Sequence, residues 1–418
     1  MARSSKEGQY YLMPLMMVTL PLVLIPVLPG TTLTVRYTMI PVTGLFLVVK
    51  AFVEGQYAEA VMHLPIVAVV TFGCLYLAVR WAQRQFESEQ VLFRDGDQLK
   101  LGDWLRHLRR DRHPVASTGH AIMCGMVILI MLFYGRLVVT SQPEGWRDLA
   151  LAVVLPQIGM ILGPTLIMAA MLTTGLRTSL RIRLPQRGAM LTALVLGFTL
   201  HPLYTQFGSL IQYFWPISPV AQEAMAPLMQ SIMQQPLLLI IVVMALIPAV
   251  CEELAFRGFI FGGLARNHGG LRAVLVTALM FGFSHAVFQQ SVTATAMGCV
   301  IGWIALRTGS VLPGIVLHVT NNALTLAIGK LTLHPEMFDS WIGHFLRADE
   351  NGQPTYQLIW TIVSASIAFA CLMYYSLFHD QDSDDRDLRR DEEEWFEQQE
   401  PTADGESREE RKSLIEVV

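Results

Sequence analysis

Two adjacent carboxylates interrupt a long apolar stretch of the sequence. Glu252 and Glu253 lie in the run Ile-Pro-Ala-Val-Cys-Glu-Glu-Leu-Ala-Phe-Arg-Gly, and Arg257 follows Glu253 by four residues. Each such charge near the centre of a bilayer costs about 2.5–3.5 kcal/mol on insertion scales. These side chains therefore need a polar cavity and partners, which makes them candidates for acid–base chemistry. The four-residue spacing predicts an ion pair between Glu253 and Arg257 on one helix face.

Three more polar side chains lie in apolar surroundings further along the chain. His285 ends the run Phe-Gly-Phe-Ser-His, and His318 and Asn322 lie four residues apart, on one face of a predicted helix. A single histidine in an apolar span is more often a hydrogen-bonded packing residue than a catalyst. Taken together with the glutamates, however, these residue types can activate a water and stabilise an oxyanion.

The depth of these groups in the membrane is also consistent. Glu252, His285 and His318 lie 14, 13 and 11 residues from the nearest arginine of a predicted loop, which is about 16–21 Å of helix. Those arginines are Arg266, Arg272 and Arg307. If they mark one membrane boundary, the three groups lie at similar depth, and we expect them to converge on one pocket.

The composition places these residues in a membrane protein. The chain has 418 residues, of which 53% are hydrophobic and 15% charged, and its mean hydropathy is +0.44. Soluble domains carry about 25% charged residues, so we predict an all-α, polytopic bundle with about ten or eleven transmembrane helices. The predicted spans are 10–30, 58–80, 119–140, 148–175, 189–207, 236–266, 272–288, 290–306, 311–329 and 357–378, with 38–54 ambiguous.

Basic residues indicate the orientation. Residues 80–113 contain eight Lys and Arg, residues 176–188 contain four, residues 208–235 contain none, and residues 331–356 contain one. The positive-inside rule therefore places the first two loops in the cytoplasm and the last two outside. Residues 379–418 carry 16 acidic and 6 basic side chains, and we expect this tail to be disordered and cytoplasmic.

The sequence gives no support for several other kinds of catalytic or ligand-binding site. The five cysteines are scattered singly, and no His-Glu-x-x-His, G-x-S-x-G or P-loop motif is present. Cys251 adjoins Glu252, but we interpret it as a packing residue, as we do His201. We expect no cofactor and no nucleic-acid partner.

The motifs resemble those of the CAAX protease and bacteriocin-processing (CPBP, or Abi) family. Glu252, Glu253 and Arg257 match its Glu-Glu-x-x-x-Arg motif, Phe281 and His285 match Phe-x-x-x-His, and the last motif, His-x-x-x-Asn, matches His318 and Asn322. The resemblance implies an intramembrane endopeptidase acting on a membrane-embedded peptide or protein in the lipid bilayer. It implies that Glu252 activates a water that His285 helps to hold, that His318 and Asn322 stabilise the oxyanion, and that Glu253 and Arg257 orient the site.

The beginning of the chain resembles a different family. Residues 1–84 are similar to the carboxy-terminal end of sodium-extrusion ABC permeases, and we expect the permease part to lack its start. We therefore divide the chain into a permease-like membrane segment (1–84), a cytoplasmic amphipathic loop (85–116), membrane helices with an extracytoplasmic surface segment (117–235), the CPBP catalytic core (236–330), an extracytoplasmic loop with the last membrane helix (331–378), and the acidic tail (379–418).

Two alternatives stay open at this point. One glutamate and two histidines are also a common zinc-ligand set, so a zinc-dependent version of the same protease fits the residue types. The permease-like start also allows an ABC-type permease subunit, with the glutamates as an ion or proton relay. Such a subunit requires a separate ATPase or permease partner, because the chain has no ATP-binding motif. In either case we expect a multi-pass protein of the bacterial inner membrane.

Overall fold

A computed structural model describes residues 22–23, 26, 33–87, 112–138, 145–217, 219–285, 287–331, 334–348 and 354–378. Its contacts divide the chain into two units, residues 1–100 and 101–418, which are described here one at a time. Most of the predicted span at 10–30, most of the amphipathic loop and all of the acidic tail lie outside the described residues.

The predicted all-α membrane bundle is confirmed. In the described residues, seven helices are long and apolar enough to cross a membrane: Tyr57–Arg80, Thr118–Arg136, Trp146–Leu172, Leu237–Arg266, Phe288–Thr308, Leu312–Leu331 and Leu358–Leu377. These seven helices correspond to seven of the ten predicted spans; the predicted span 10–30 lies mostly outside the described residues, and 189–207 falls within the helix Ala189–Phe214. The stretches predicted at 38–54 and 272–288 form shorter apolar helices, Thr43–Val53 and Gly270–Phe283.

The first unit contains α2 (Val35–Thr38), α3 (Thr43–Val53) and α4 (Tyr57–Glu87). Helices α3 and α4 form a hairpin, and Gly55 turns the chain between them with a φ of 79° that an L side chain rarely adopts. Leu47, Val48 and Ala51 of α3 pack against Ala60 and Val67 of α4. These apolar residues make a small core for this unit alone.

The second unit is a larger bundle around the segment 237–268. Its helices are α6 (Thr118–Val138), α7 (Trp146–Pro156), η3 (Gln157–Leu162), α8 (Gly163–Leu172), α9 (Leu176–Ser179), α10 (Ala189–Phe214), α11 (Pro219–Met233), α12 (Leu237–Ile241), η4 (Val242–Leu246), α13 (Ile247–Glu253), η5 (Leu254–Ile260), α14 (Phe261–His268), α15 (Gly270–Phe283), α16 (Phe288–Thr308), α17 (Leu312–Leu331) and α18 (Leu358–Phe378). Between α17 and α18 lie the short helices η6 (Pro335–Asp339) and η7 (Trp341–His344) and a hairpin of β1 (Leu346–Ala348) and β2 (Pro354–Tyr356). The two strands are antiparallel, with Arg347 opposite Thr355.

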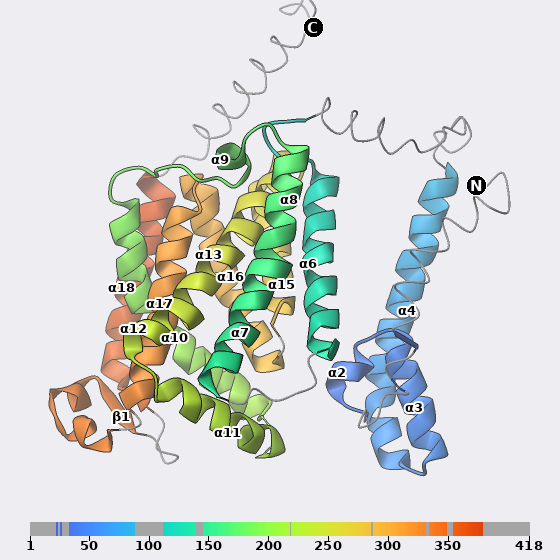
Figure 1. Ribbon diagram of the computed structural model, residues 1–418, viewed down its shortest axis with the longest axis horizontal. Helices are drawn as coiled ribbons and strands as arrows, with labels where there is room; N and C mark the ends of the chain where they lie inside the picture. The colour runs from blue at the N-terminus through green and yellow to red at the C-terminus, as the bar shows by residue number, and fades with distance from the viewer. Residues whose placement is uncertain are drawn as a thin grey trace, which may run out of the picture. The chain divides into compact units, whose positions relative to one another are not determined.

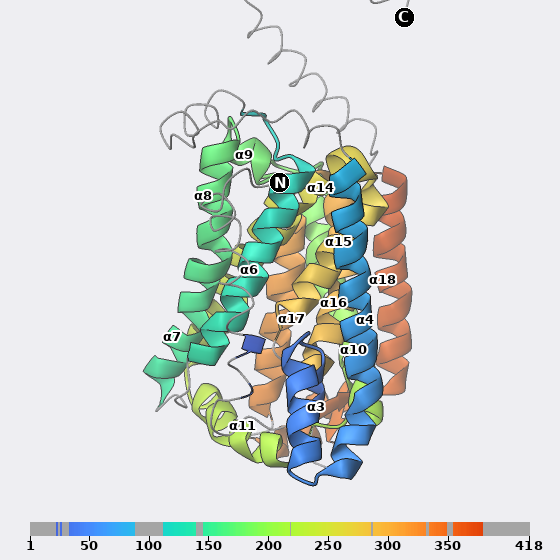
Figure 2. The ribbon, with the colours of Figure 1, turned by 90° about the vertical axis from the view of Figure 1, so that its right-hand side faces the viewer.

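The ends of the second unit differ in the way the basic residues predict. Helix α9, in the basic loop 176–188, lies at one end of the bundle, whereas α11 and the β1–β2 hairpin lie at the other (Figures 1 and 2). Helix α11 lies across that second end. The basic loop 176–188 is therefore at the opposite end of the bundle from α11 and the hairpin.

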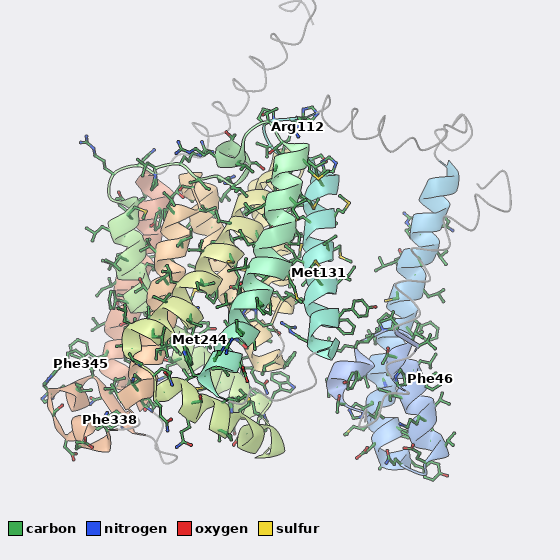
Figure 3. All side chains as sticks on the ribbon, viewed as in Figure 1. Phe46, Arg112, Met131, Met244, Phe338 and Phe345 are labelled. Carbon is green, nitrogen blue, oxygen red and sulfur yellow. The ribbon has the colours of Figure 1, made fainter. Side chains whose placement is uncertain are left out.

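The core of the second unit surrounds η5. Phe256, Phe259, Ile260 and the following Phe261 are completely buried, and they pack in one cluster with residues of α6, α8, α15 and α16. Many side chains on the outside of the bundle are apolar as well, among them Met131 on α6 (Figure 3). This pattern is expected of a bundle with a lipid-facing surface.

Three segments of this bundle, η3, η4 and η5, are π-helices. A π-helix closes its hydrogen bonds over five residues instead of four, which widens the turn, and such segments are frequent at functional sites. Proline lacks an N–H and crowds the carbonyl one turn earlier, and Pro156 directly precedes η3. Both glutamates lie between η4 and η5, at the end of α13.

Candidate active site

Glu252 lies near the middle of the span Leu237–Arg266, with only 5% of its surface exposed. Gln157, on η3 of a different span, donates a hydrogen bond from Nε2 to Glu252 Oε1 over 2.7 Å. The second oxygen, Glu252 Oε2, lies 3.8 Å from His318 Nε2. That distance is too long for a direct hydrogen bond. One oxygen of this carboxylate is thus held, and the other faces an imidazole across a short gap.

Glu253 and Arg257 form the predicted ion pair, and both side chains are completely buried. Arg257 Nη1 donates to Glu253 Oε1 over 3.0 Å, and Arg257 Nη2 donates to the carbonyl of Gly298 over 3.2 Å. The guanidinium carbon also lies 4.4 Å from the centre of the Phe281 ring, which is a cation–π contact. The arginine therefore joins η5 to both α15 and α16.

His318 connects the two glutamates. Its Nδ1 lies 2.9 Å from Glu253 Oε1, the oxygen that also accepts from Arg257. A carboxylate can only accept a hydrogen bond, so Nδ1 carries a proton and donates it. Nε2 is thereby turned toward Glu252. A carboxylate on the far side of an imidazole fixes the orientation of the ring.

His285 is oriented in a similar way by the backbone. Its Nδ1 lies 3.0 Å from the carbonyl of Phe281, which can only accept, so this nitrogen carries a proton. In a neutral ring the other nitrogen, Nε2, is then an acceptor. The Phe281 ring makes edge contacts with both His285 and His318, with centroids 5.0 and 5.8 Å apart. Phe281 thus packs between the two histidines.

A cavity of about 850 Å³ contains this cluster. Glu252, His285, His318 and Asn322 all line it, together with residues of α6, α7, η3 and α16. Its volume lies in the range of small-ligand sites, about 300–1,000 Å³. Glu253 and Arg257 are not among the residues that line this cavity. Thus the structure brings Glu252, Glu253, Arg257 and His318 into direct contact or near contact, and His285 and Asn322 face the same space.

The structure also adds cavity residues that the sequence motifs do not include. Gln157, Asn321 and Arg136 line the cavity, and Arg136 donates to the carbonyl of Ser284, next to His285. Gln157 carried one sequence signal, because it is a polar residue inside the predicted span 148–175. Asn321 had none, since the motif spacing selects Asn322. The side-chain oxygens of Gln157 and Asn321 are buried without a hydrogen-bond partner.

Two other polar candidates lie outside the cavity lining. His201 is 1% exposed and is held between Tyr356 Oη at 2.9 Å and Thr325 Oγ1 at 3.0 Å. It anchors the β1–β2 hairpin to α10 and α17, in agreement with the packing interpretation. Cys251 is buried beside Glu252 as a free thiol and is not among the lining residues.

The donor set for zinc is present, but its members are apart. Among the described residues, no group of three or more His, Cys, Asp and Glu side chains is arranged to hold a metal ion.

Comparisons with known proteins agree with the location of the cluster. Residues 234–324 match the family of type II CAAX prenyl endopeptidase Rce1-like proteins. Among curated proteins, the putative membrane peptidase YdiL of Bacillus subtilis (strain 168) is 28% identical over 119 residues, which are 28% of this chain and 48% of that protein. The chain thus spans about half the length of this relative, and no solved structure matches it.

The family match does not include residues 1–84, so their resemblance to a permease stays a prediction. It does include all three motifs that contribute to the polar cluster, from the paired glutamates on α13 to Asn322 on α17. Residues 234–324 of this multi-pass membrane protein are therefore similar to the type II CAAX prenyl endopeptidase Rce1-like family.

Proposed function

We propose that this protein is an intramembrane endopeptidase in which Glu252 activates a water for attack on a peptide bond. The observation that carries this proposal is the 3.8 Å gap between Glu252 Oε2 and His318 Nε2, inside a cavity that His285 also lines. A carboxylate with one free oxygen, next to two imidazoles and an amide, is a suitable arrangement for hydrolysis without a covalent intermediate.

In the first step, a water hydrogen-bonded to Glu252 Oε2 and His285 Nε2 attacks the carbonyl carbon of the substrate. The carbon–oxygen bond forms while Glu252 takes one proton of the water, and the carbonyl oxygen becomes an oxyanion. His318 Nε2–H and the Asn322 amide stabilise that oxyanion. Loss of one such donor costs about 2.7–4 kcal/mol of barrier in well-studied hydrolases.

In the second step, Glu252 gives its proton to the leaving nitrogen. The carbon–nitrogen bond breaks, the carbonyl re-forms, and the products are an acid and an amine. Glu252 is then again a carboxylate, ready for the next water. Positioned proton transfer of this kind typically contributes about 10²–10⁴-fold to the rate.

The proposed role of His318 requires a proton on both ring nitrogens. Nδ1 lies 2.9 Å from Glu253 Oε1, and Nε2 lies 3.8 Å from Glu252 Oε2. In the doubly protonated ring both nitrogens are donors, Nδ1 to Glu253 and Nε2 toward the cavity.

The substrate is a segment of a membrane peptide or protein that enters the cavity in an extended form. The cavity volume of about 850 Å³ suits a few residues of chain, not a folded domain. We further propose that the acidic tail faces the cytoplasm, together with the basic loops, and that any ABC transporter partner binds outside the CPBP domain.

The test is a cleavage assay with the full chain in lipid vesicles and a panel of tagged membrane peptides. Wild type should cleave at least one peptide, Glu252→Gln should lose about 10²-fold or more of the rate, and Glu336→Gln should cleave like wild type. Glu336 is a fitting control because its side chain is 73% exposed and is not among the residues that line the cavity. Equal cleavage by wild type and Glu252→Gln refutes the mechanism. Ion flux that survives Glu252→Gln, with no cleavage by wild type, supports the permease alternative instead.

A further inference from the structure

Gln157 contacts the carboxylate that the mechanism depends on, yet it lies outside the family match, on a helix that carries none of the motifs. It is the first residue of η3, directly after Pro156. Gln157 and Glu252 both line the cavity, and their side chains are in contact. The contact is short, 2.7 Å from Nε2 to Oε1, as expected for a hydrogen bond to a charged acceptor.

We propose that Gln157 is a positioning residue that determines which oxygen of Glu252 takes the proton from water. This inference rests on the proposed function. A free carboxylate can rotate and present either oxygen to the cavity. The Gln157 amide holds Oε1, so Oε2, the oxygen facing His318, is the one left to act as the base.

The chemistry of the two groups fixes the orientation of the glutamine. A carboxylate is only an acceptor, so the amide must turn its Nε2 toward Glu252 and its Oε1 away. That Oε1 is buried and has no hydrogen-bond partner. An unpaired buried carbonyl is costly, so the orientation of the amide is maintained by the hydrogen bond of its Nε2 to the charged Glu252.

The location on η3 explains how this contact is maintained. The span Trp146–Leu172 runs without interruption through α7, η3 and α8, and its π-helical part packs against α13, which carries Glu252. Ile161, one turn after Gln157, is buried in the core cluster with Phe256 and Ile260. Packing on the core-facing side of η3 therefore fixes the position of the backbone at Gln157.

Two replacements separate positioning from simple packing. Gln157→Met keeps the approximate length and volume of the side chain but removes the donor. Gln157→Glu keeps the shape but donates only when its own carboxyl is protonated. A glutamine on the outside of α10, Gln206, is exposed, and Gln206→Met serves as the matched control.

The first measurement is the kinetics of cleavage by the full chain in lipid vesicles, across a range of pH. Gln157→Met should lower kcat about ten- to a hundredfold, with KM within about twofold of wild type, because one hydrogen bond to a charged group is lost. Gln157→Glu should be similarly slow at high pH and should recover relative to wild type as the pH falls. Gln206→Met should be unchanged.

The second measurement does not require cleavage. A hydrophobic carbodiimide modifies protonated carboxyl groups in membranes, and mass spectrometry of the Glu252 peptide gives the extent of labelling. At the same pH, Glu252 should be labelled several times faster in Gln157→Met than in wild type, since its carboxylate has lost an N–H donor.

Equal labelling and equal kcat in wild type and Gln157→Met overturn the inference. So does a Gln157→Glu variant that follows Gln157→Met at every pH, because the side chain would then matter only for its packing. If wild type cleaves no peptide but the labelling differs as expected, the proposed protease function fails while the positioning of Glu252 by Gln157 stands.

Discussion

Replacement of Glu253 by glutamine tests the role of the buried ion pair. Arg257 is completely buried, and its Nη1 lies 3.0 Å from Glu253 Oε1. Glutamine has the same shape but leaves the guanidinium without a neutralising charge. Removal of one partner of a buried pair destabilises proteins by about 3–5 kcal/mol. The cation–π contact with Phe281, at 4.4 Å, remains and should keep the loss at the lower end, about 3 kcal/mol.

The assay is thermal unfolding of the purified full chain in detergent. An unfolding entropy of about 2.1 cal/mol/K per residue gives about 1 °C per kcal/mol for a chain of 418 residues, so the Tm of Glu253→Gln should fall by about 3–4 °C. The double variant Glu253→Gln with Arg257→Met should lose less stability than the two single losses together, because neither charge is then left alone. Glu336→Gln is the control, with an exposed side chain. An unchanged Tm for Glu253→Gln, or strictly additive losses in the double variant, would refute this account of the pair.

Two other predictions concern the helix contact behind the pair and the chemistry of the cavity. A Cβ at Gly298 would lie 3.1 Å from the backbone Cα of Ala278 and 3.0 Å from Arg257 Nη2, so Gly298→Ala should destabilise the protein by about 1–3 kcal/mol. Gly208→Ala, with nothing within 4 Å of the new Cβ, should leave the Tm unchanged or slightly raised, and equal Tm values for the two variants would contradict the predicted close contact. Cleavage should persist after dialysis against a chelator. Zinc at one per chain, with activity lost on chelation and restored by zinc, would instead establish the metal-dependent version of the protease.

The sequence predicted those features that depend on spacing along one helix. Glu253 and Arg257 are four residues apart, and they form the expected ion pair within one turn. His285 follows α15 and His318 lies on α17, yet both line one cavity with Glu252, as the depth estimate from nearby arginines predicts. Membrane spans were also predictable, because long apolar runs have few alternatives in a bilayer.

Features that depend on how helices face one another were not predictable. Nothing in the apolar span 148–175 indicates that Gln157 points toward Glu252 and not toward a neighbouring carbonyl. The predicted span 272–288 ends early, at Phe283, because Ser284 and His285 turn the chain before α16. The sequence did not predict the π-helices either. One additional residue in a turn shifts the hydrophobic periodicity, and a stretch that is apolar on all sides has no periodicity in which the shift could be seen.

The wide turns of η5 allow the central helix of the second unit to change length at one place. Residues before η5 present Glu252 and Glu253, and residues after it pack α14 against α6 and α15. A π-helical turn holds about one residue more than an α-helical turn, so removal of one residue from η5 would let the helix return to ordinary winding with the faces before and after it nearly in register. In the ordinary winding of α14, the same deletion would rotate everything beyond it by about 100° relative to the glutamates. A one-residue deletion in η5 should consequently do less damage than a one-residue deletion in α14.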